Sequence, residues 1–345
     1  MNFDLTDEQR MLQDTLRKAL ATANDPWAAL AELGVIGALF SEGAGGFGGT
    51  GFDIAVVFEE LGRADVALPM IDRALVPGLL LTAAGHDIAD VIAGTEKLAW
   101  AHGELGARYD LDWVETRADG DAISGQKTVV VGAEDADSII VTARHAGAAN
   151  DHTGIGLWRV AGDAAGLTLH GYDIAQGGRA AELTLENTPG EPLLPEAFDA
   201  LSQAVAAATL AQMAETLGAM ETVAAMTQDY LKTRKQFGRP IGSFQVLAHR
   251  LADMMLEVEQ ARSAVILAAG HLHDAPAQRD LHVSAAKNLI GRAGRMIAEE
   301  AIQMHGGIGM TEEYALGRFA KRIIMADHRF GDTDHHLERF IALRA

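Results

Sequence analysis

Residues 196–237, "EAFDALSQAVAAATLAQMAETLGAMETVAAMTQDYLKTRKQF", decide the fold. The stretch is rich in alanine and methionine, contains no proline, and keeps one helical pattern throughout. At about 1.5 Å per residue, such a helix would be about 60 Å long, which is more than a single small domain needs. Its small side chains permit close approach of other helices, so the sequence predicts a bundle of long helices that packs against other subunits.

The segments on either side of this helix differ in character. Two further helices are expected near 243–272 and 278–305, and a last one from Thr333. Residues 98–192 alternate short β-branched runs with Asp-Gly and Ser-Gly turns, which is typical of antiparallel strands. Residues 1–97 read as helical, beginning at a capping box of Thr6 and Gln9. We therefore expect an α+β protein with an N-terminal helical domain (1–97), a small antiparallel β-domain (98–192) and a C-terminal long-helix bundle (193–345).

Composition excludes several classes of function. The chain has 28 basic and 48 acidic residues, a net charge of −20, which disfavours nucleic acid and anionic membranes as partners. It contains no cysteine, so disulfides, thiolate metal sites and cysteine nucleophiles are excluded. The start lacks the basic and apolar regions of a signal peptide, and no apolar run is long enough to span a membrane. The glycine-rich "SEGAGGFGGTG" (41–51) matches no phosphate-binding fingerprint and reads as a flexible connector. We expect a cytoplasmic protein.

Two motifs, "YLKTRKQFGRPIGSFQVLAHRLADM" (230–254) and "AIQMHGGIGMTEEYALGRFAKR" (301–322), resemble the acyl-CoA dehydrogenase family. The order of helices, sheet and helices agrees with that family, as does "DEQRMLQDTLRKAL" (7–20), so the resemblance covers essentially the whole chain. It implies FAD as cofactor, an acyl-CoA thioester as substrate, and α,β-desaturation as the reaction. An electron-transferring flavoprotein is the acceptor that the resemblance implies.

The resemblance also implies which residues hold the cofactor. In the family, the first motif grips the ADP half of the FAD of a neighbouring subunit, and the second offers backbone N–H groups close to that cofactor. A guanidinium has fixed donors for a pyrophosphate, and an aromatic ring packs against adenosine. The predicted FAD-binding residues of the two motifs are Arg234, Gln236, Phe237, Gln245, Gln303, Gly306 and Gly307. By itself, the second motif could equally be a capped helix end whose glycines only turn the chain.

The family's catalytic base is missing at both of its usual positions. A carboxylate has to remove the α-proton of the thioester. Most members carry it in a Tyr-Glu-Gly-Thr segment before the last helix, where this chain has Phe330, Gly331, Asp332 and Thr333. Others place it on the long helix, at the position of Ala208. Glu215 lies about two turns, or about 10 Å, further along that helix, which is too far to replace it without remodelling.

The segments that surround the flavin ring in the family are also altered. "WAHGELGARYD" (100–110) keeps neither the threonine nor the Ser-Asp pair of the family's flavin-ring segment. After the family's Gly-x-Lys, here Gly125-Gln126-Lys127, three valines (129–131) replace the Trp-Ile-Thr or Trp-Ile-Ser that packs against the isoalloxazine. The residues expected to bind ADP are therefore present, while those expected to hold the flavin ring are replaced by others.

This combination is similar to the small subunits of heteromeric acyl-CoA dehydrogenases of the pimeloyl-CoA or steroid side-chain type. These subunits lack the base and pair with a larger subunit in an α2β2 assembly, in fatty-acid or steroid catabolism. The favoured hypothesis is therefore a base-lacking, FAD-sharing small subunit without a catalytic residue of its own. A second hypothesis is a self-sufficient homo-oligomer that uses Asp332 or Glu215 as base. A third is a flavin-free CoA-binding or assembly protein on the same scaffold.

"HRFGDTDHHLERF" (328–340) concentrates histidines and aspartates and has several readings. A metal site would need its histidines and aspartates to converge on one ion, which we do not expect, because Gly331 and the cap-like Asp332 and Thr333 indicate that a helix begins between them. The plainer reading is that helix start with solvated histidines. Asp332 could also be a displaced base. We favour a remnant of the family's segment, in which Thr333 keeps the flavin-side position and the base has gone.

Overall fold

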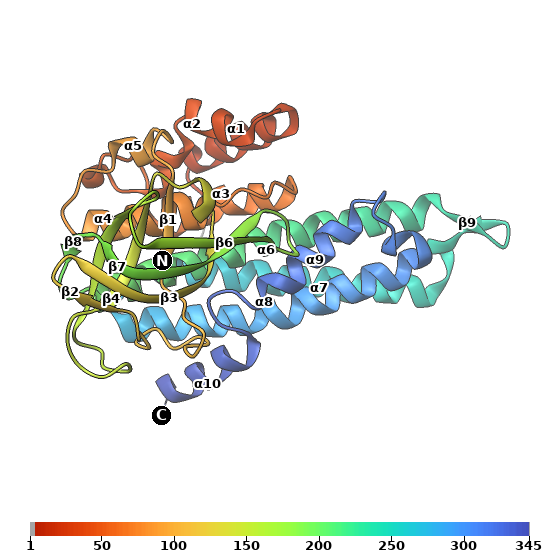
Figure 1. Cartoon of the computed structure of the whole chain (residues 1–345). Helices are drawn as coiled ribbons and strands as arrows, with labels where there is room; N and C mark the ends of the chain where they lie inside the picture. Colours follow the sequence, from red (N-terminus) through yellow and green to blue (C-terminus); the bar gives the residue numbers. More distant parts are fainter. Residues whose placement is uncertain (1–3, 345) are drawn as a thin grey trace. The chain divides into compact units, whose positions relative to one another are not determined.

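The computed structural model describes residues 4–344, which divide into two compact units. The helical unit contains the chain up to Asn24, then Thr50–Ala67, and the chain from Thr209 onward. The sheet unit contains Asp25–Gly49 and Leu68–Ala208. The predicted α+β order of helices, sheet and long helices is confirmed (Figure 1). Because both units combine separate stretches of the chain, the predicted domain limits at 97 and 192 stay a prediction.

The sheet unit is built on an eight-stranded sheet in the order β6-β7-β3-β2-β4-β5-β8, with β1 beside β4. Its core consists of apolar side chains from alternating strand positions, among them Ile123, Val141 and Leu183. The strands are β1 (Leu98–Ala101), β2 (Arg117–Asp119), β3 (Ala122–Val131), β4 (Ser138–Arg144), β5 (Ile155–Ala161), β6 (Leu167–Asp173), β7 (Arg179–Pro189) and β8 (Glu191–Leu194).

The sheet is mixed, which corrects the expectation of a purely antiparallel one. β1 pairs with β4 in parallel, and β2 meets β4 in parallel at Arg117 and Arg144. Parallel neighbours need a long crossover connection, and residues 102–137 supply one between β1 and β4. Local alternation of residues cannot reveal this pairing, because it depends on strands that are far apart in sequence.

Short helices complete the sheet unit. They are α2 (Pro26–Glu32), η1 (Val35–Leu39), η2 (Glu42–Ala44), η3 (Ile71–Leu75), α4 (Val76–Ala83) and α5 (Ala89–Ile92). The glycine-rich segment after η1 is a connector, as predicted, but a packed one. A Cβ on Gly46 would lie 2.2 Å from the carbonyl oxygen of Phe40, and the N–H of Gly48 donates to that same oxygen at 2.9 Å. Glycine is needed here because the backbone turns back against itself.

The helical unit consists of long helices, a small hairpin and short turns. Its elements are α1 (Asp7–Thr22), α3 (Gly51–Arg63), most of α6 (Phe198–Thr233), β9 (Lys235–Gln236), β10 (Arg239–Pro240), η5 (Ile241–Ser243), α7 (Gln245–His271), α8 (Pro276–His305), η6 (Gly306–Met310), α9 (Leu316–Ala326) and α10 (Thr333–Arg344). The capping box of Thr6 and Gln9 is present. The sequence reading missed α9 as a separate helix. No helix within residues 4–344 is long and apolar enough to cross a membrane.

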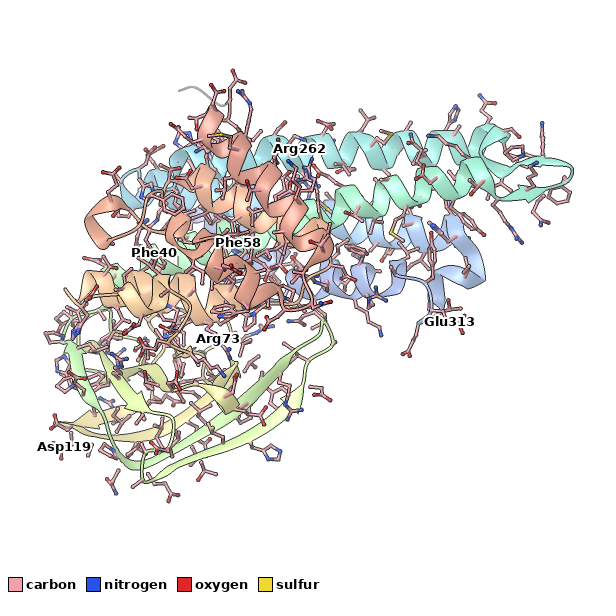
Figure 2. The ribbon with its side chains drawn as sticks, turned by 90° about the horizontal axis from the view of Figure 1, so that it is seen from above. Phe40, Phe58, Arg73, Asp119, Arg262 and Glu313 are labelled. Carbon is pink, nitrogen blue, oxygen red and sulfur yellow. The ribbon has the colours of Figure 1, made fainter. Side chains whose placement is uncertain are left out.

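Glycines let α3 and α6 pack backbone to backbone. A Cβ on Gly62 would lie 1.9 Å from the carbonyl oxygen of Glu215, and a Cβ on Gly218 would lie 2.0 Å from that of Glu59. Beside this crossing, Arg63 and Arg262 (Figure 2) both pair with Glu59 and Glu221. The close helix approach expected from the small residues of the long helix is thus present, and an ion-pair network joins α3, α6 and α7.

Candidate cofactor and acyl-CoA site

The first predicted FAD motif forms an exposed hairpin where α6 ends (Figure 1). The helix stops at Thr233, and β9 and β10 pair with Gln236 opposite Arg239. The two turn residues between them, Phe237 and Gly238, have φ of +53° and +78°, as a tight two-residue hairpin turn requires. The expected continuation of the helix to Phe237 is therefore wrong, because these two residues adopt left-handed backbone conformations.

Phe237 is an unusual residue at such a turn. A bulky residue with positive φ is a true conformational outlier, and strain of this kind concentrates at functional sites. Its side chain is 89% exposed, and its ring meets only the edge of Phe244, with centroids 6.0 Å apart, among the ring contacts found in residues 4–344. The hairpin thus holds an aromatic ring outward, where another molecule can pack on it.

The other residues of the first motif lie close to that ring. Arg234 and Gln236 are exposed in the same hairpin, and Gln245 begins α7 directly after Phe244. The guanidinium of Arg239 lies over the ring of Phe244, 4.2 Å from its centroid. The structure therefore brings four predicted residues together at one end of the helical unit: Arg234, Gln236, Phe237 and Gln245.

The second motif lies at the same end, because an aromatic contact joins the last residue of α8 to α6. His305, the last residue of α8, stacks on Tyr230 of α6 at 4.4 Å between ring centroids, and its Nε2 lies 3.3 Å from the hydroxyl of Tyr314. Tyr230 precedes Arg234 by one turn of α6. Burial lowers the pKa of His305. Tyr230, His305 and Tyr314 were not among the predicted site residues, although all three lie within the two motifs.

The glycines of the second motif leave open space for a ligand. Gly306 ends α8 with φ +66° and ψ −143°, and both it and Gly307 are exposed. A Cβ on either would meet no atom of the described residues within 4 Å. Gln303 is exposed one turn earlier. An arginine, an outward aromatic ring and open space beside two exposed glycines at one place suit a dinucleotide with its pyrophosphate, so the residues present fit FAD.

The position of the family's glutamate has no room for a side chain. Gly331 is buried with φ +104°, and a Cβ there would lie 2.6 Å from atoms of both His335 and His336. The preceding residue, Phe330, also has a positive φ of +58°. Two consecutive residues thus have positive φ, a conformation that a glutamate at position 331 would adopt only with strain.

Asp332, the candidate displaced base, acts as a helix cap. Its carboxylate accepts the N–H of His335 at 2.9 Å, directly before α10 begins at Thr333. The Thr333 hydroxyl donates to Asp327 Oδ1 at 3.0 Å. The predicted helix start is confirmed, but the prediction of solvated histidines is wrong for His336, which is 1% exposed. Within residues 4–344, no three histidine or acidic side chains are grouped so as to hold a metal ion.

The buried histidine predicts a pH-dependent stability. Burial, with smaller contributions from Lys287, His335 and Arg339, lowers the pKa of His336 to about 3, while its hydrogen bond with the Phe330 carbonyl acts in the opposite direction. Since the unfolded form binds protons from about pH 6.5 downward, the free energy of unfolding should fall by up to about 1.4 kcal/mol per pH unit from pH 6.5 toward pH 3.

Urea unfolding at several pH values of wild type and His336→Gln measures this contribution, with the exposed His328→Gln as matched control. Between pH 6.5 and pH 3, the free energy of unfolding should change less steeply with pH in His336→Gln than in wild type, and as steeply as in wild type in His328→Gln. Equal slopes in both variants would contradict the assignment.

The alternative positions on α6 hold no available base. Ala208 is fully buried. The Glu215 carboxylate pairs with the guanidinium of Arg322, which also binds Asp65. If Glu215 took a proton from the substrate, its carboxylate would be neutralised and this largely buried ion pair would break. Glu215 therefore has a structural role in α6.

In the sheet unit, a buried ion pair ties the altered flavin-ring segment to β3. Lys127 is fully buried, and its ammonium donates to Glu104 at 2.6 Å, to the carbonyl of His102 at 3.1 Å and to Thr142 at 3.1 Å. Burial lowers the pKa of Lys127 to about 8, while Glu104 acts in the opposite direction. Lys127 and Glu104 were not among the predicted site residues, because burial of a charge cannot be read from a local pattern.

The valines in place of the flavin-packing aromatic form a bulge. The register of β3 against β7 shifts between Lys127 and Val130, and Val129 is 58% exposed with φ +53°. Its N–H donates to Glu182 Oε1 at 3.3 Å, an oxygen that also accepts the hydroxyl of Tyr172 at 2.6 Å. The bulge therefore keeps a strained backbone but presents a small aliphatic side chain where relatives have a large ring.

Comparison with known proteins agrees with this geometry. The model of the acyl-CoA dehydrogenase N-terminal domain matches residues 6–87, and that of the C-terminal domain matches residues 198–342. The chain is 32% identical over 337 residues to the acyl-CoA dehydrogenase IpdE2 of Mycobacterium tuberculosis, covering 92% of this chain and 91% of that protein. It is 28% identical to the benzylmalonyl-CoA dehydrogenase of Aromatoleum aromaticum, covering 94% of each.

Solved structures share the fold. A structure titled "Tcur3481-Tcur3483 steroid ACAD G363A variant" is similar with a TM-score of 0.87 and 28% identity, covering 98% of each chain. The two domain models match residues 6–87 and 198–342, and the IpdE2 alignment covers 92% of the chain. The chain belongs to the acyl-CoA dehydrogenase family, the FAD-dependent oxidoreductases that act on a CH–CH bond of an acyl-CoA thioester.

Proposed function

We propose that this chain is the base-lacking, FAD-sharing small subunit of a heteromeric acyl-CoA dehydrogenase that desaturates a bulky or unusual CoA thioester. The observation that carries the proposal is the filled space at Gly331, where a Cβ would collide with His335 and His336. A larger partner subunit would supply the glutamate and the pocket for the isoalloxazine, in an α2β2 assembly. The similar steroid ACAD bears the names of two components in its title, which supports a two-component assembly.

The residues of the helical unit would contribute to cofactor binding. FAD, when bound, accepts the hydride from the β-carbon of the thioester. Arg234 would bind the pyrophosphate, Phe237 would pack on the adenosine, and Gln236 and Gln245 would add hydrogen bonds. Gln303 would offer an amide donor, and Gly306 and Gly307 would let the cofactor come close to the backbone. The exposed hairpin and the open space at the glycines support these roles, because both are accessible to a second subunit.

The remaining partners follow from the family. The reduced flavin would pass its electrons to an electron-transferring flavoprotein, and the site of action would be the cytoplasm. Thr333 would keep a flavin-side position, although its hydroxyl already donates to Asp327. A flavin-free assembly protein is the least supported reading, because it leaves the exposed ring of Phe237 and the open glycines without a purpose.

The second candidate is a self-sufficient enzyme that uses Asp332 or Glu215. Asp332 is the better of the two, because it follows the family's glutamate position directly and is half-buried. Against it, its carboxylate caps α10 and carries one methylene fewer than glutamate.

Asp332→Asn and Glu215→Gln separate the two candidates. Asparagine preserves the helix cap and removes the base, so the variant keeps the fold. We expect each variant, assembled with its partner, to retain wild-type turnover within about twofold. Turnover is measured with acyl-CoA and an artificial electron acceptor. A loss of about 1000-fold or more in either variant would show that this chain supplies the base.

A further inference from the structure

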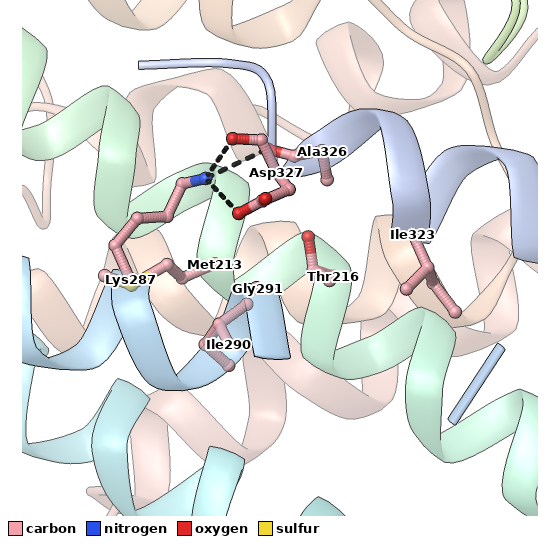
Figure 3. A pocket seen from close by; sticks show the side chains of 8 residues that line it. All are labelled: Met213, Thr216, Lys287, Ile290, Gly291, Ile323, Ala326 and Asp327. Atoms are coloured by element: carbon pink, nitrogen blue, oxygen red, sulfur yellow. Dashed lines mark hydrogen bonds and ion pairs between the residues drawn. The ribbon is translucent and has the colours of Figure 1, made fainter. Parts of the chain in front are cut away.

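A buried lysine of α8 binds the end of α9, a few residues before Gly331, the position where the family has its base. Lys287 of α8 is 1% exposed, and its ammonium donates to the carbonyl oxygens of Ala326 at 3.0 Å and Asp327 at 3.1 Å (Figure 3). The Asp327 carboxylate lies 3.8 Å away. These carbonyls end α9, where a cation is favourable because the last carbonyls of a helix have no intrahelical donor. Burial lowers the pKa of Lys287 to about 8, while Asp327 acts in the opposite direction.

The same face of α8 also holds the start of α10. Asp327 Oδ1 accepts the hydroxyl of Thr333 at 3.0 Å, and Asn288 donates its side-chain amide to the Thr333 carbonyl at 2.9 Å. Gly291 makes room for this contact, since a Cβ there would lie 2.2 Å from both Asp327 Oδ1 and Thr333 Oγ1. Both ends of the connector, residues 327–332, are therefore fixed to α8.

The middle of the connector is closed by His336. Its Nε2 lies 2.9 Å from the carbonyl oxygen of Phe330, and its Nδ1 lies 3.3 Å from the hydroxyl of Ser284, again on α8. Four α8 residues at the spacing i, i+3, i+4 and i+7 share one face of the helix: Ser284, Lys287, Asn288 and Gly291. This face, named here the α8 anchor, contacts Asp327 and Thr333 at the two ends of the connector and His336, whose ring meets the Phe330 carbonyl.

We propose that the α8 anchor locks the connector in a base-free form, with Lys287 as its principal positioning residue. The empty base position is then a property of the backbone, and restoring a glutamate at position 331 does not create a base. This inference rests on the proposed function, because it explains why this chain leaves the proton transfer to a partner. In this proposal, the α8 anchor holds the connector so that position 331 has no room for a side chain.

Amide hydrogen exchange of the purified chain tests the role of Lys287. Lys287→Met keeps the length of the side chain and leaves the carbonyls of Ala326 and Asp327 without their donor. We expect exchange in residues 328–336 to quicken at least tenfold, with α1 and α3 unchanged. The control is Lys321→Met, an exposed lysine of α9. Equal exchange in the two variants would overturn the role of Lys287, whatever the chain's catalytic role.

A second pair of variants tests the closed base position. Gly331→Ala should lower the Tm by roughly 5 °C, because alanine tolerates neither φ +104° nor the contacts with His335 and His336. In a His336→Ala background the same change should lower the Tm less, since the contact with His336 is gone while φ +104° and the contact with His335 remain. Equal costs in both backgrounds, or no cost in either, would overturn the steric closure.

Gly331→Glu provides the chemical readout. In the complex assembled from this variant and a partner whose own glutamate is changed to glutamine, we expect no bleaching of the flavin by acyl-CoA. Bleaching at the wild-type rate in that complex would overturn the proposal, since a single residue would then have restored the base. The proposed function fails by a different result, namely bleaching by the wild-type chain alone.

Discussion

Replacing Arg234 by alanine is expected to raise the dissociation constant for FAD of the assembled enzyme about 100-fold. A charge-assisted hydrogen bond to a phosphate contributes about 1.5–3 kcal/mol, and each 1.4 kcal/mol changes affinity tenfold. Arg234 is exposed in the hairpin that ends α6, next to a phenylalanine that is 89% exposed. Its guanidinium is thus accessible to an FAD molecule that is bound mainly by a partner subunit.

The measurement is a fluorescence titration of the apo complex with FAD. The matched control is Lys232→Ala, an exposed cation two residues earlier on α6, which should change the dissociation constant less than twofold. Phe237→Ala should raise the dissociation constant for FAD about tenfold, because the contact of the ring with the adenosine is lost. An Arg234→Ala complex that binds FAD as tightly as the Lys232→Ala complex would contradict the predicted cofactor site.

Replacing Arg144 by methionine is expected to lower the free energy of unfolding by about 4 kcal/mol or more. Arg144 of β4 is fully buried, and its guanidinium donates to six backbone carbonyls. Those acceptors are the carbonyl oxygens of Asp112, Val114, Ala146, Ala149, Asp151 and Thr153. Methionine would remove all six of these hydrogen bonds, and each buried group left unsatisfied costs about 1–3 kcal/mol. Of the six carbonyls, that of Ala149 keeps a second donor, the N–H of Val114 at 2.8 Å.

Arg117 offers a matched control for that variant. It is exposed and donates to one carbonyl of the same loop, that of Gly147, at 2.9 Å. Arg117→Met should therefore cost less than about 1 kcal/mol. Urea unfolding followed by tryptophan fluorescence compares the two variants. Equal losses would mean that the loop between β4 and β5 does not depend on the Arg144 guanidinium.

Local sequence patterns were sufficient for most of the long helices, whereas the two cofactor motifs followed from the family resemblance and their role stays a prediction. The capping box at Thr6, the bounds of α7 and α8, and the start of α10 at Thr333 follow from side-chain periodicity and capping residues. Non-local features were not predictable in this way. The parallel pairing of β1 with β4 and the end of α6 before Phe237 depend on strand partners and on backbone conformations that no periodicity encodes.

Burial explains most of what the sequence did not reveal. Lys127, Lys287 and His336 are ordinary polar residues in the sequence, and each is almost fully buried in the structure. Their partners come from other elements, so no local motif marks them. The missing glutamate was visible as Gly331, but the closure around it became evident only from the positions of His335 and His336.

The most direct test of the account is the FAD content of this chain purified alone, together with the response of that flavin to acyl-CoA. The account predicts an apoprotein that takes up about half an equivalent of FAD per chain, counted over both kinds of subunit, only when a larger partner is present. About one tightly bound FAD per chain, bleached by an acyl-CoA without any partner, would contradict it and would make Asp332 the first residue to test as the base.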